Sequence, residues 1–376
     1  MKLAFTGYYG MENYGDDLFV LASTYGAHKY WNTKPTIVGM EMKGIDAKFQ
    51  VNKFGNLYSG KNVFSKFYRM QVMLKTFIGN DIVVMAGGST ISSDTSNRMR
   101  QFQYRMLEKR ISKMAAIGVS LGPFNNKEDF ERAKRLIERF EYIAVRDELS
   151  FNTLKSMNVK TPYILGRDIA GVIPLIVPNE KSENKKEVLG ISICNYESFT
   201  NGDVEQEINR NKAMISAITK FGKDRKKELL IKICVLNLHP DLGDMKISKE
   251  LQKELNKEGV DSEIVFHNSD PLYMWKEITS CDAFFSVRLH GAITAYLGDI
   301  PFVLIEYHEK CSSFLDDVGY LSDYRIKPGC NDDKYIYEVI EKLFSRKEPV
   351  ATLSSVEYSK DSERTFLSAP WSKTRI

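Results

Sequence analysis

The sequence lacks the cysteine patterns that mark zinc-binding and disulfide-rich proteins. Its five cysteines are scattered, and no pair of them has Cys-x-x-Cys spacing. Neither a zinc site nor a disulfide framework is indicated, and no cluster of metal ligands is visible, so we expect no metal. We interpret the chain as a reduced, cytoplasmic protein. The cysteines expected to be buried thiols are Cys194, Cys234 and Cys281.

Long apolar runs, a strong net charge and low-complexity tracts are also missing. No apolar run approaches the length of a transmembrane helix, and the apolar stretch at the N-terminus is too short for a signal peptide. The net charge of +4 alone is too small to indicate a nucleic-acid partner. It suits an anionic substrate or the edge of an anionic membrane. Nothing in the sequence indicates an oligomeric state.

Apolar runs alternate with helical patterns throughout the 376 residues, which is typical of parallel α/β layers. The length suits two domains, and a charged, proline-bearing stretch divides two similar halves. We therefore predict two Rossmann-like domains with parallel sheets facing a central cleft. The predicted divisions are a first domain over 1–178, a linker over 179–187, a second domain over 188–330, and a C-terminal helix and tail over 331–376.

The strongest candidate site in the chain is the stretch Ser286-Val287-Arg288-Leu289-His290-Gly291. A strand-type run becomes a helix-type run there, and ligands of open α/β sheets bind where strands end and helices begin. A helix start offers backbone N–H groups and the positive end of the helix dipole. Arg288 and His290 add a guanidinium and a proton donor, so the stretch predicts a phosphate or carboxylate site.

Two glycine-rich loops also follow predicted strands. The first runs from Gly7 to Asp17, where Asn13 and Asp16 either meet a ligand or cap the following helix. The second, Gly87-Gly88-Ser89, either wraps an anion with its N–H groups or makes a tight strand-to-helix turn. For each loop, a ligand-binding role and a purely structural role both stay open.

Three further cations stand near strand ends. Arg146 follows a predicted strand and either pairs with Asp147 or Glu148 or points into the cleft. Arg167 poses the same choice. Lys310 follows the next strand after Arg288 and is either solvated or able to reach the same rim.

Taken in order, these motifs resemble the polysaccharide pyruvyl transferase family from about residue 7 to residue 319. The motif series consists of Gly10-x-x-Asn13-x-Gly15-Asp16, Gly87-Gly88, Gly118-x-x-x-Gly122-Pro123, Val145-Arg146-Asp147-x-x-Ser150, Ser286-x-Arg288-Leu289-His290-Gly291 and Tyr307-x-x-Lys310. The resemblance implies a GT-B-like fold, phosphoenolpyruvate as the donor substrate without a further cofactor, and a sugar acceptor. The products would be a pyruvate ketal and phosphate.

The resemblance also implies roles for individual residues. Arg288, His290 and Gly291 would belong to the donor site, helped by Arg167 or Arg146 and by Lys310. We predict His290 as the general acid, Arg288 as the clamp on phosphate or carboxylate, and Asp16 as the base on the acceptor side. The remaining loop residues predicted to line the cleft on the acceptor side are Gly10, Asn13, Gly15, Gly87, Gly88 and Ser89. The sequence departs from the family pattern at Asp17, at Ser89-Thr90 and at Arg167-Asp168.

Two other functions remain open. One is a glycosyltransferase of the same fold that uses a nucleotide sugar. Many such enzymes carry a Glu-x7-Glu pair, and here Phe314 stands eight residues after Glu306. The other is a non-catalytic binding protein of a glycan pathway.

The acceptor itself is expected to belong to a surface polysaccharide or to its lipid-linked precursor, which would place the protein at the inner face of the membrane. Basic and aromatic residues between 61 and 110 form either a membrane-facing surface or an ordinary solvated helix face. The residues of this set are Lys61, Phe64, Lys66, Phe67, Tyr68, Arg69, Lys75, Arg98, Arg100, Phe102, Tyr104, Arg105, Lys109 and Arg110.

Overall fold

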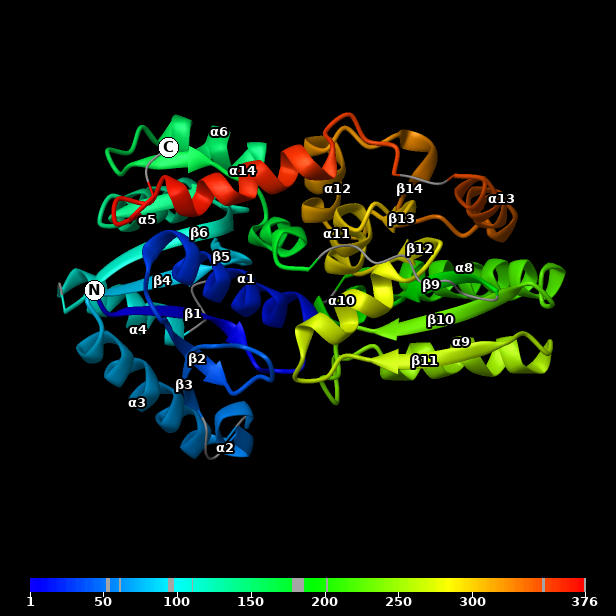
Figure 1. Ribbon diagram of the computed structural model, residues 1–376, viewed down its shortest axis with the longest axis horizontal. Helices are drawn as coiled ribbons and strands as arrows, with labels where there is room; N and C mark the ends of the chain where they lie inside the picture. Colours follow the sequence, from blue (N-terminus) through cyan, green and yellow to red (C-terminus); the bar gives the residue numbers. More distant parts are fainter. Residues whose placement is uncertain are drawn as a thin grey trace. The chain divides into compact units, whose positions relative to one another are not determined.

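The computed structural model describes residues 1–51, 55–60, 62–93, 98–109, 111–177, 186–200, 202–346 and 349–374. They form two compact units, each built on a parallel sheet (Figure 1). This confirms the predicted fold class of two Rossmann-like α/β domains. The first unit comprises Met1–Met11, Asp16–Ile176 and Tyr358–Ile376, and the second comprises Glu12–Gly15 and Val177–Glu357. The predicted boundary at 178 and most of the predicted linker, 179–185, lie outside the described residues, and Glu187 already begins a strand.

The sheet of the first unit has the strand order β3-β2-β1-β4-β6-β7-β8, with every pair parallel. Strands β4 and β7 are buried along their whole length, and β1 and β6 along most of theirs, which explains their continuous apolar sequences. The strands are β1 (Leu3–Tyr9), β2 (Thr36–Met40), β3 (Lys48–Val51), β4 (Ile82–Ala86), β5 (Ser89–Ile91), β6 (Lys113–Leu121), β7 (Tyr142–Val145) and β8 (Tyr163–Leu165).

Helices cover this sheet, and the C-terminal residues return to join them. The elements are α1 (Tyr14–Trp31), α2 (Gly55–Ser59), α3 (Val63–Gly79), α4 (Arg98–Glu108), α5 (Lys127–Ile137), α6 (Glu148–Met157), the 3-10 helix η1 (Ile169–Leu175) and α14 (Ser355–Leu367). The predicted tail thus continues as a helix into the first unit. There the Trp31 Nε1 atom donates to the Phe366 carbonyl at 2.8 Å, and Phe366 stacks on Tyr30.

The sheet of the second unit has the strand order β11-β10-β9-β12-β13-β14, again all parallel. This is the doubly wound order. Successive strands are added outward on one side of β9 and then on the other, so the strand order reverses between β9 and β12. The strands are β9 (Glu187–Ser192), β10 (Leu229–Val235), β11 (Ser262–Phe266), β12 (Ala283–Ser286), β13 (Phe302–Ile305) and β14 (Arg325–Ile326).

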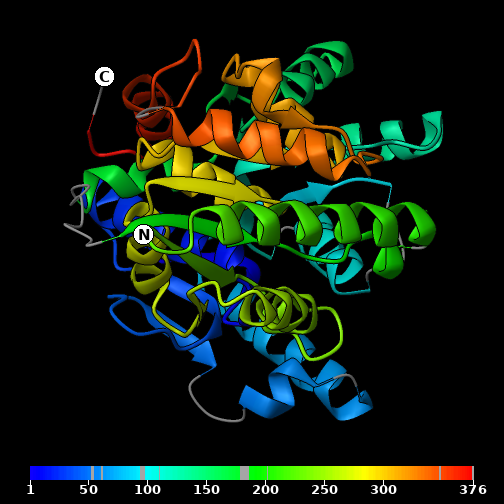
Figure 2. The ribbon, with the colours of Figure 1, turned by 90° about the vertical axis from the view of Figure 1, so that its right-hand side faces the viewer.

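The helices of the second unit follow the winding of its sheet. Figure 2 faces this unit and shows α8 (green) beside α13 (orange), which pack together, as do α8 and α9. The elements are α7 (Glu197–Thr200), α8 (Val204–Asp224), α9 (Met245–Lys257), α10 (Pro271–Thr279), α11 (Leu289–Leu297), α12 (Glu309–Asp317), the 3-10 helix η2 (Ser322–Tyr324) and α13 (Asp333–Phe344).

Both winding patterns place a ligand site in the same topological position. In a doubly wound sheet, the crevice lies at the carboxyl ends of the strands, beside the point where the strand order reverses. In the first unit that point lies between β1 and β4, and in the second between β9 and β12. The loops predicted as sites follow β1, β4 and β12, so the fold brings them to these positions.

Candidate functional site

The site in the second unit begins where β12 ends. Arg288 is the N-cap residue of α11, with an extended backbone and no side-chain capping bond. The Ser286 hydroxyl donates instead to the Arg288 carbonyl at 2.6 Å and fixes the turn. The first N–H groups of α11 and the positive end of its dipole therefore lie at the switch point of the sheet.

Asp244 holds the Arg288 guanidinium in place. Arg288 Nε donates to both carboxylate oxygens of Asp244 at 3.1 Å, and Nη2 donates to Oδ1 at 2.5 Å. Among the described residues, no hydrogen bond is made by Nη1. Because a guanidinium has a second edge that can bind an oxyanion, this geometry leaves that edge available to a ligand.

The Asp244 carboxylate is fully buried, whereas 20% of the Arg288 side chain is exposed. Burial raises the pKa of the Asp244 carboxyl, and the Arg288 guanidinium and the Asn237 N–H oppose that rise. Burial opposes the charge of Arg288, but Cys194 and Asp244 outweigh it and raise the pKa of the guanidinium. The arginine therefore stays charged at any physiological pH.

His290 packs directly on the backbone of Gly15. A Cβ atom at Gly15 would stand 2.2 Å from His290 Nδ1 and 2.6 Å from Cγ. Only glycine leaves room for the imidazole in this position. The structure thus brings together Gly15 and His290, which the sequence placed in separate motifs.

The segment that carries Gly15 is pinned to the second unit by backbone pairing. Asn13 forms an antiparallel bridge with Asn237, and the Tyr14 N–H donates to the Leu236 carbonyl at 2.9 Å. The buried Tyr14 hydroxyl shares a hydrogen bond of 2.9 Å with the hydroxyl of Thr294 on α11. Asn13 and Gly15 therefore lie in the same unit as His290, and Gly15 lies against its imidazole.

Gly291 lets α11 approach the sheet closely. A Cβ atom at Gly291 would stand 2.5 Å from Ser286 Oγ and 3.0 Å from the Phe284 ring. The role of this glycine in the structure is therefore close packing of the helix start that carries His290.

Lys310 lies in the first turn of α12, whose N-cap is His308. Its ammonium stands 5.8 Å from the centre of the Tyr307 ring. Burial raises the pKa of Tyr307, and Arg288 is among the charges that act on this phenol. Tyr307, the first residue of the motif Tyr307-x-x-Lys310, is thus an electrostatic neighbour of Arg288.

In the first unit, the loop after β1 closes on the start of α1. The buried Asp17 carboxylate accepts a hydrogen bond from the Gly10 N–H at 2.7 Å, and Gly10 has a φ of +70°. Asp16 is partly exposed in the same helical turn, and its charge adds to burial in raising the pKa of Tyr9. Asp17 therefore shapes the turn, and its neighbour Asp16 is accessible.

The loop after β4 is a turn of two left-handed glycines. Gly87 and Gly88 have φ values of +78° and +79°, and a Cβ atom at Gly87 would stand 2.2 Å from the Phe19 ring. The prediction of a strand-to-helix turn was wrong in one respect. Ser89 begins the short strand β5, which pairs with β6, because the two glycines redirect the chain along the sheet.

The two arginines from the middle of the chain both engage carboxylates. The Arg146 guanidinium donates to Asp168 at 2.9 Å and to the Ser120 hydroxyl at 2.7 Å, and its side chain is 8% exposed. Arg167 forms an ion pair with Asp361 at 3.5 Å. The Arg146 contacts hold the end of β7 to the start of η1, which is a structural task. A donor-binding role for either arginine stays a prediction.

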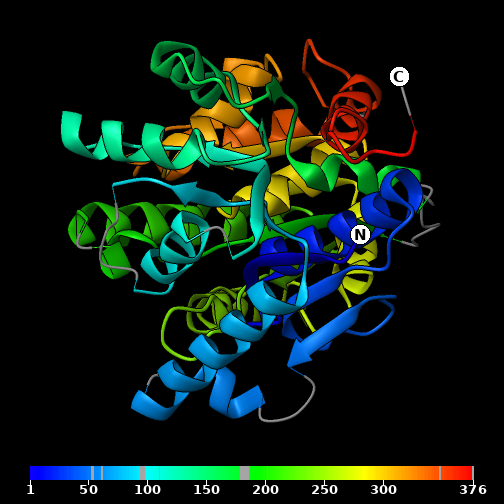
Figure 3. The ribbon, with the colours of Figure 1, turned by 90° about the vertical axis from the view of Figure 1, so that its left-hand side faces the viewer.

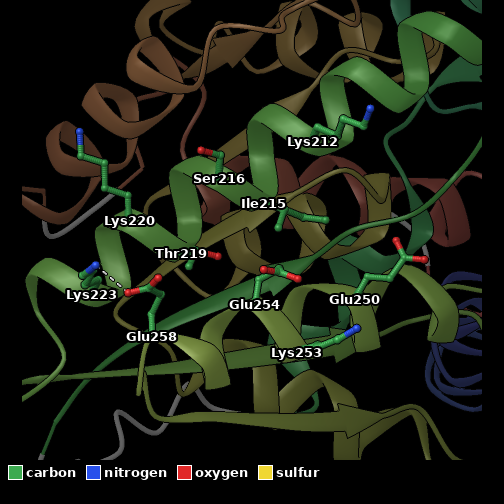
Figure 4. A pocket seen from close by; sticks show the side chains of 10 residues that line it. All are labelled: Lys212, Ile215, Ser216, Thr219, Lys220, Lys223, Glu250, Lys253, Glu254 and Glu258. Carbon is green, nitrogen blue, oxygen red and sulfur yellow. Dashed lines mark ion pairs between the residues drawn. The ribbon is translucent and has the colours of Figure 1, made fainter.

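An open groove of about 640 Å³ lies between α8 and α9, away from these loops. Figure 4 shows lysines of α8 on one wall and, on the other, the glutamates together with Lys253 of α9. Lys223 and Glu258 pair across the groove at 2.6 Å. No predicted site residue lines this groove.

Within the described ranges, no group of three or more His, Cys, Asp or Glu side chains is arranged to hold a metal ion. Over the same ranges, no helix is long and apolar enough to span a membrane.

The sequence model of the polysaccharide pyruvyl transferase family matches residues 13–309. The chain therefore belongs to the polysaccharide pyruvyl transferase family. No curated protein matches the chain in sequence.

Solved structures of low sequence identity share the fold. UDP-GlcNAc 2-epimerase from Methanocaldococcus jannaschii is 15% identical, with a TM-score of 0.59 over 97% of this chain and 98% of that one. The Neisseria meningitidis UDP-GlcNAc 2-epimerase bound to UDP-GlcNAc is 14% identical, with a TM-score of 0.59 over 98% and 100%. The S. aureus MnaA–UDP structure is 10% identical, with a TM-score of 0.61 over 96% and 91%. At these identities the likeness defines the GT-B-like fold and nothing further.

Proposed function

We propose that this protein transfers the pyruvyl group of phosphoenolpyruvate to a sugar of a surface polysaccharide or of its lipid-linked precursor. The product is a pyruvate ketal, and phosphate is released. Membership of the family supports pyruvyl transfer to a polysaccharide. The observation that carries the donor assignment is the pairing of Arg288 and His290 at the start of α11, beside the reversal point of the second sheet.

The donor is an anion with a phosphate and a carboxylate, so it needs fixed positive groups. The proposal assigns one of these anionic groups to the Nη1 edge of Arg288, with Asp244 holding the opposite edge. The N–H groups at the start of α11 add partial positive charge. Lys310 is proposed as a further cation for the same ligand.

The chemistry requires one proton donor and one proton acceptor. In the proposed reaction His290 gives a proton to the methylene carbon of phosphoenolpyruvate, which becomes a methyl group. Asp16 takes the proton of the first sugar hydroxyl as its oxygen bonds to C2. The C2–O bond to phosphate then breaks as a second hydroxyl of the same sugar bonds to C2, and the proton of that hydroxyl leaves with the phosphate. Atoms and charge balance without a redox partner.

Calorimetric titration with phosphoenolpyruvate tests the donor assignment. We expect the wild-type protein to bind it and Arg288→Ala to bind about tenfold to hundredfold more weakly, the loss typical of charge-assisted hydrogen bonds. Arg325→Ala is a matched control, because the Arg325 side chain is 18% exposed and also pairs with a buried carboxylate, Glu306. Equal binding by Arg288→Ala and wild type would rule out the assignment.

The same titration with UDP-GlcNAc tests the rival function. Tight binding of the nucleotide sugar, with no binding of phosphoenolpyruvate, would assign the protein to the glycosyltransferases instead. The role of His290 is tested by phosphate release in the presence of acceptor. We expect His290→Ala to keep donor binding and to lose about 10²- to 10⁴-fold in rate, as general acids do.

A further inference from the structure

The helix α3 carries an exposed apolar stripe along its whole length. Apolar side chains recur on one face at helical spacing, and every one is exposed, from 39% at Leu74 to 77% at Val63. The stripe consists of Val63, Phe64, Phe67, Met70, Leu74 and Ile78. Isolated exposed apolar residues are ordinary on protein surfaces, but a contiguous apolar face marks a site of interaction.

The opposite face of α3 fixes the helix in this orientation. Val72, Met73 and Phe77 are buried, and the helix packs on β2, β3 and β4 of the first unit. Figures 1 and 3 show α3 next to the short helix α2 at one edge of that unit. The stripe therefore faces outward because the sheet already holds the other side of the helix.

The charges on α3 are of one sign and lie on both sides of the stripe. Each residue turns an α-helix by about 100°, which places Lys66 on one flank of the stripe and Lys75 on the other. Both lysines are exposed. Neither α2 nor α3 contains an acidic residue, and α4, which packs on α3, contains one, Glu108.

We propose that this face of α3 docks the protein on an anionic lipid surface. An interfacial helix has a continuous apolar face with basic side chains at its borders, so that the apolar groups enter the headgroup region and the cations meet lipid phosphates. At 17 residues the helix is roughly 25 Å long and lies flat on its sheet. A second copy of the chain fits the face less well, because two such helices would bring lysines together with no carboxylate on α3 to pair with them.

The proposal goes beyond pyruvyl transfer and does not depend on it. Flotation of the full-length protein is measured with vesicles of phosphatidylcholine, with and without phosphatidylglycerol. We expect binding to the mixed vesicles that weakens at high salt. Phe67→Ser/Leu74→Ser should lower the partition coefficient about tenfold or more on both vesicles. Lys66→Gln/Lys75→Gln should lower it about fivefold per lysine on the anionic vesicles alone.

Controls separate a lipid surface from other occupants. Ile208→Ser/Val356→Ser removes two apolar side chains of comparable or greater exposure, 48% and 61%, from α8 and α14 and should leave flotation unchanged. No flotation of the wild type, or wild-type flotation by Phe67→Ser/Leu74→Ser, overturns the proposal. So does a wild-type dimer in light scattering that these substitutions convert to monomers, since the stripe would then be a contact between copies. Phosphoenolpyruvate titration of the α3 variants should match the wild type.

Discussion

Replacing Gly15 by alanine is the sharpest perturbation of the site. The added methyl group would stand 2.2 Å from His290 Nδ1, whereas ordinary contact begins at 3.4 Å. Gly15 is the second residue of α1, and its segment is pinned by backbone pairing at Asn13 and Tyr14. The imidazole therefore has to move, because the backbone beside it is held.

The size of the effect follows from that overlap. His290 must shift by about 1 Å, and a displacement of that size at a reacting group costs about 10²-fold in rate. Stability should change less, since the cost of overpacking, about 1–3 kcal/mol, is partly offset by the gain of up to about 1 kcal/mol for alanine over glycine in a helix. We expect Gly15→Ala to fold, to retain phosphoenolpyruvate binding through Arg288, and to lose turnover.

The assay is phosphate release per folded molecule, alongside the NMR signals of the His290 ring. Gly26→Ala is the matched control, because it lies on the same helix and its added Cβ atom would stand 2.2 Å from the Phe366 ring. That variant should lose stability and keep its rate and its His290 signals. Unchanged His290 signals and an unchanged rate in Gly15→Ala would refute the argument that the glycine positions the histidine.

Two further predictions concern buried carboxylates of the second unit. Burial opposes the charge of Glu306, but hydrogen bonds from Arg325 and neighbouring groups lower its pKa to about 2. Glu306→Gln should therefore cost about 2 kcal/mol of unfolding free energy at neutral pH. In urea titrations this difference from wild type should disappear as the pH falls from about 4.5 to 2; a constant difference would contradict it. Asp244→Asn leaves Arg288 without its counter-charge, so the melting temperature should fall. Added phosphate should then raise the melting temperature of this variant by more than it raises that of the wild type. An equal rise in both proteins would argue against an open guanidinium edge.

Strands buried on both faces were predictable because their apolar runs are continuous. Ile82–Ala86 and Ala283–Ser286 are strands of this kind, buried along their whole length. The edge strand Lys48–Val51 was missed because its four residues alternate between polar and apolar types and are mostly half-buried or exposed, so no continuous apolar run marks it. Short sheet-edge strands depend on their neighbours for their conformation.

The extent of helix α14 could not be predicted from the sequence, for a different reason. Its buried face includes the hydroxyl residues Ser359, Ser362 and Thr365, so hydrophobic periodicity is weak. Ser362 donates to the Asp168 carbonyl at 2.9 Å, and a Cβ atom at Gly171 would stand 2.0 Å from Ser362 Oγ. Small hydroxyl side chains permit this close approach, and a pattern of apolar residues cannot reveal it.

The same limit applies to the site. Arg288 and His290 could be paired because a single residue, Leu289, separates them, and their position at a strand end indicated their chemistry. Asp244 lies 44 residues from Arg288, and only the adjacency of the ends of β10, β9 and β12 brings its carboxylate to the guanidinium. Contacts of this kind depend on strand order, which a single sequence does not state.

Two residues of the loop from Gly10 to Asp17 have separate structural roles. Gly15 packs on His290 within the second unit, whereas Asp17 binds the Gly10 N–H within the first. One helix start thus serves two different contacts two residues apart, and neither is a turn that wraps a phosphate. Gly15 leaves room for the His290 imidazole beside it, and the Asp17 carboxylate stabilises the turn at Gly10. Asp16, between them, is partly exposed, and its carboxylate is the group proposed to take the proton of the sugar hydroxyl.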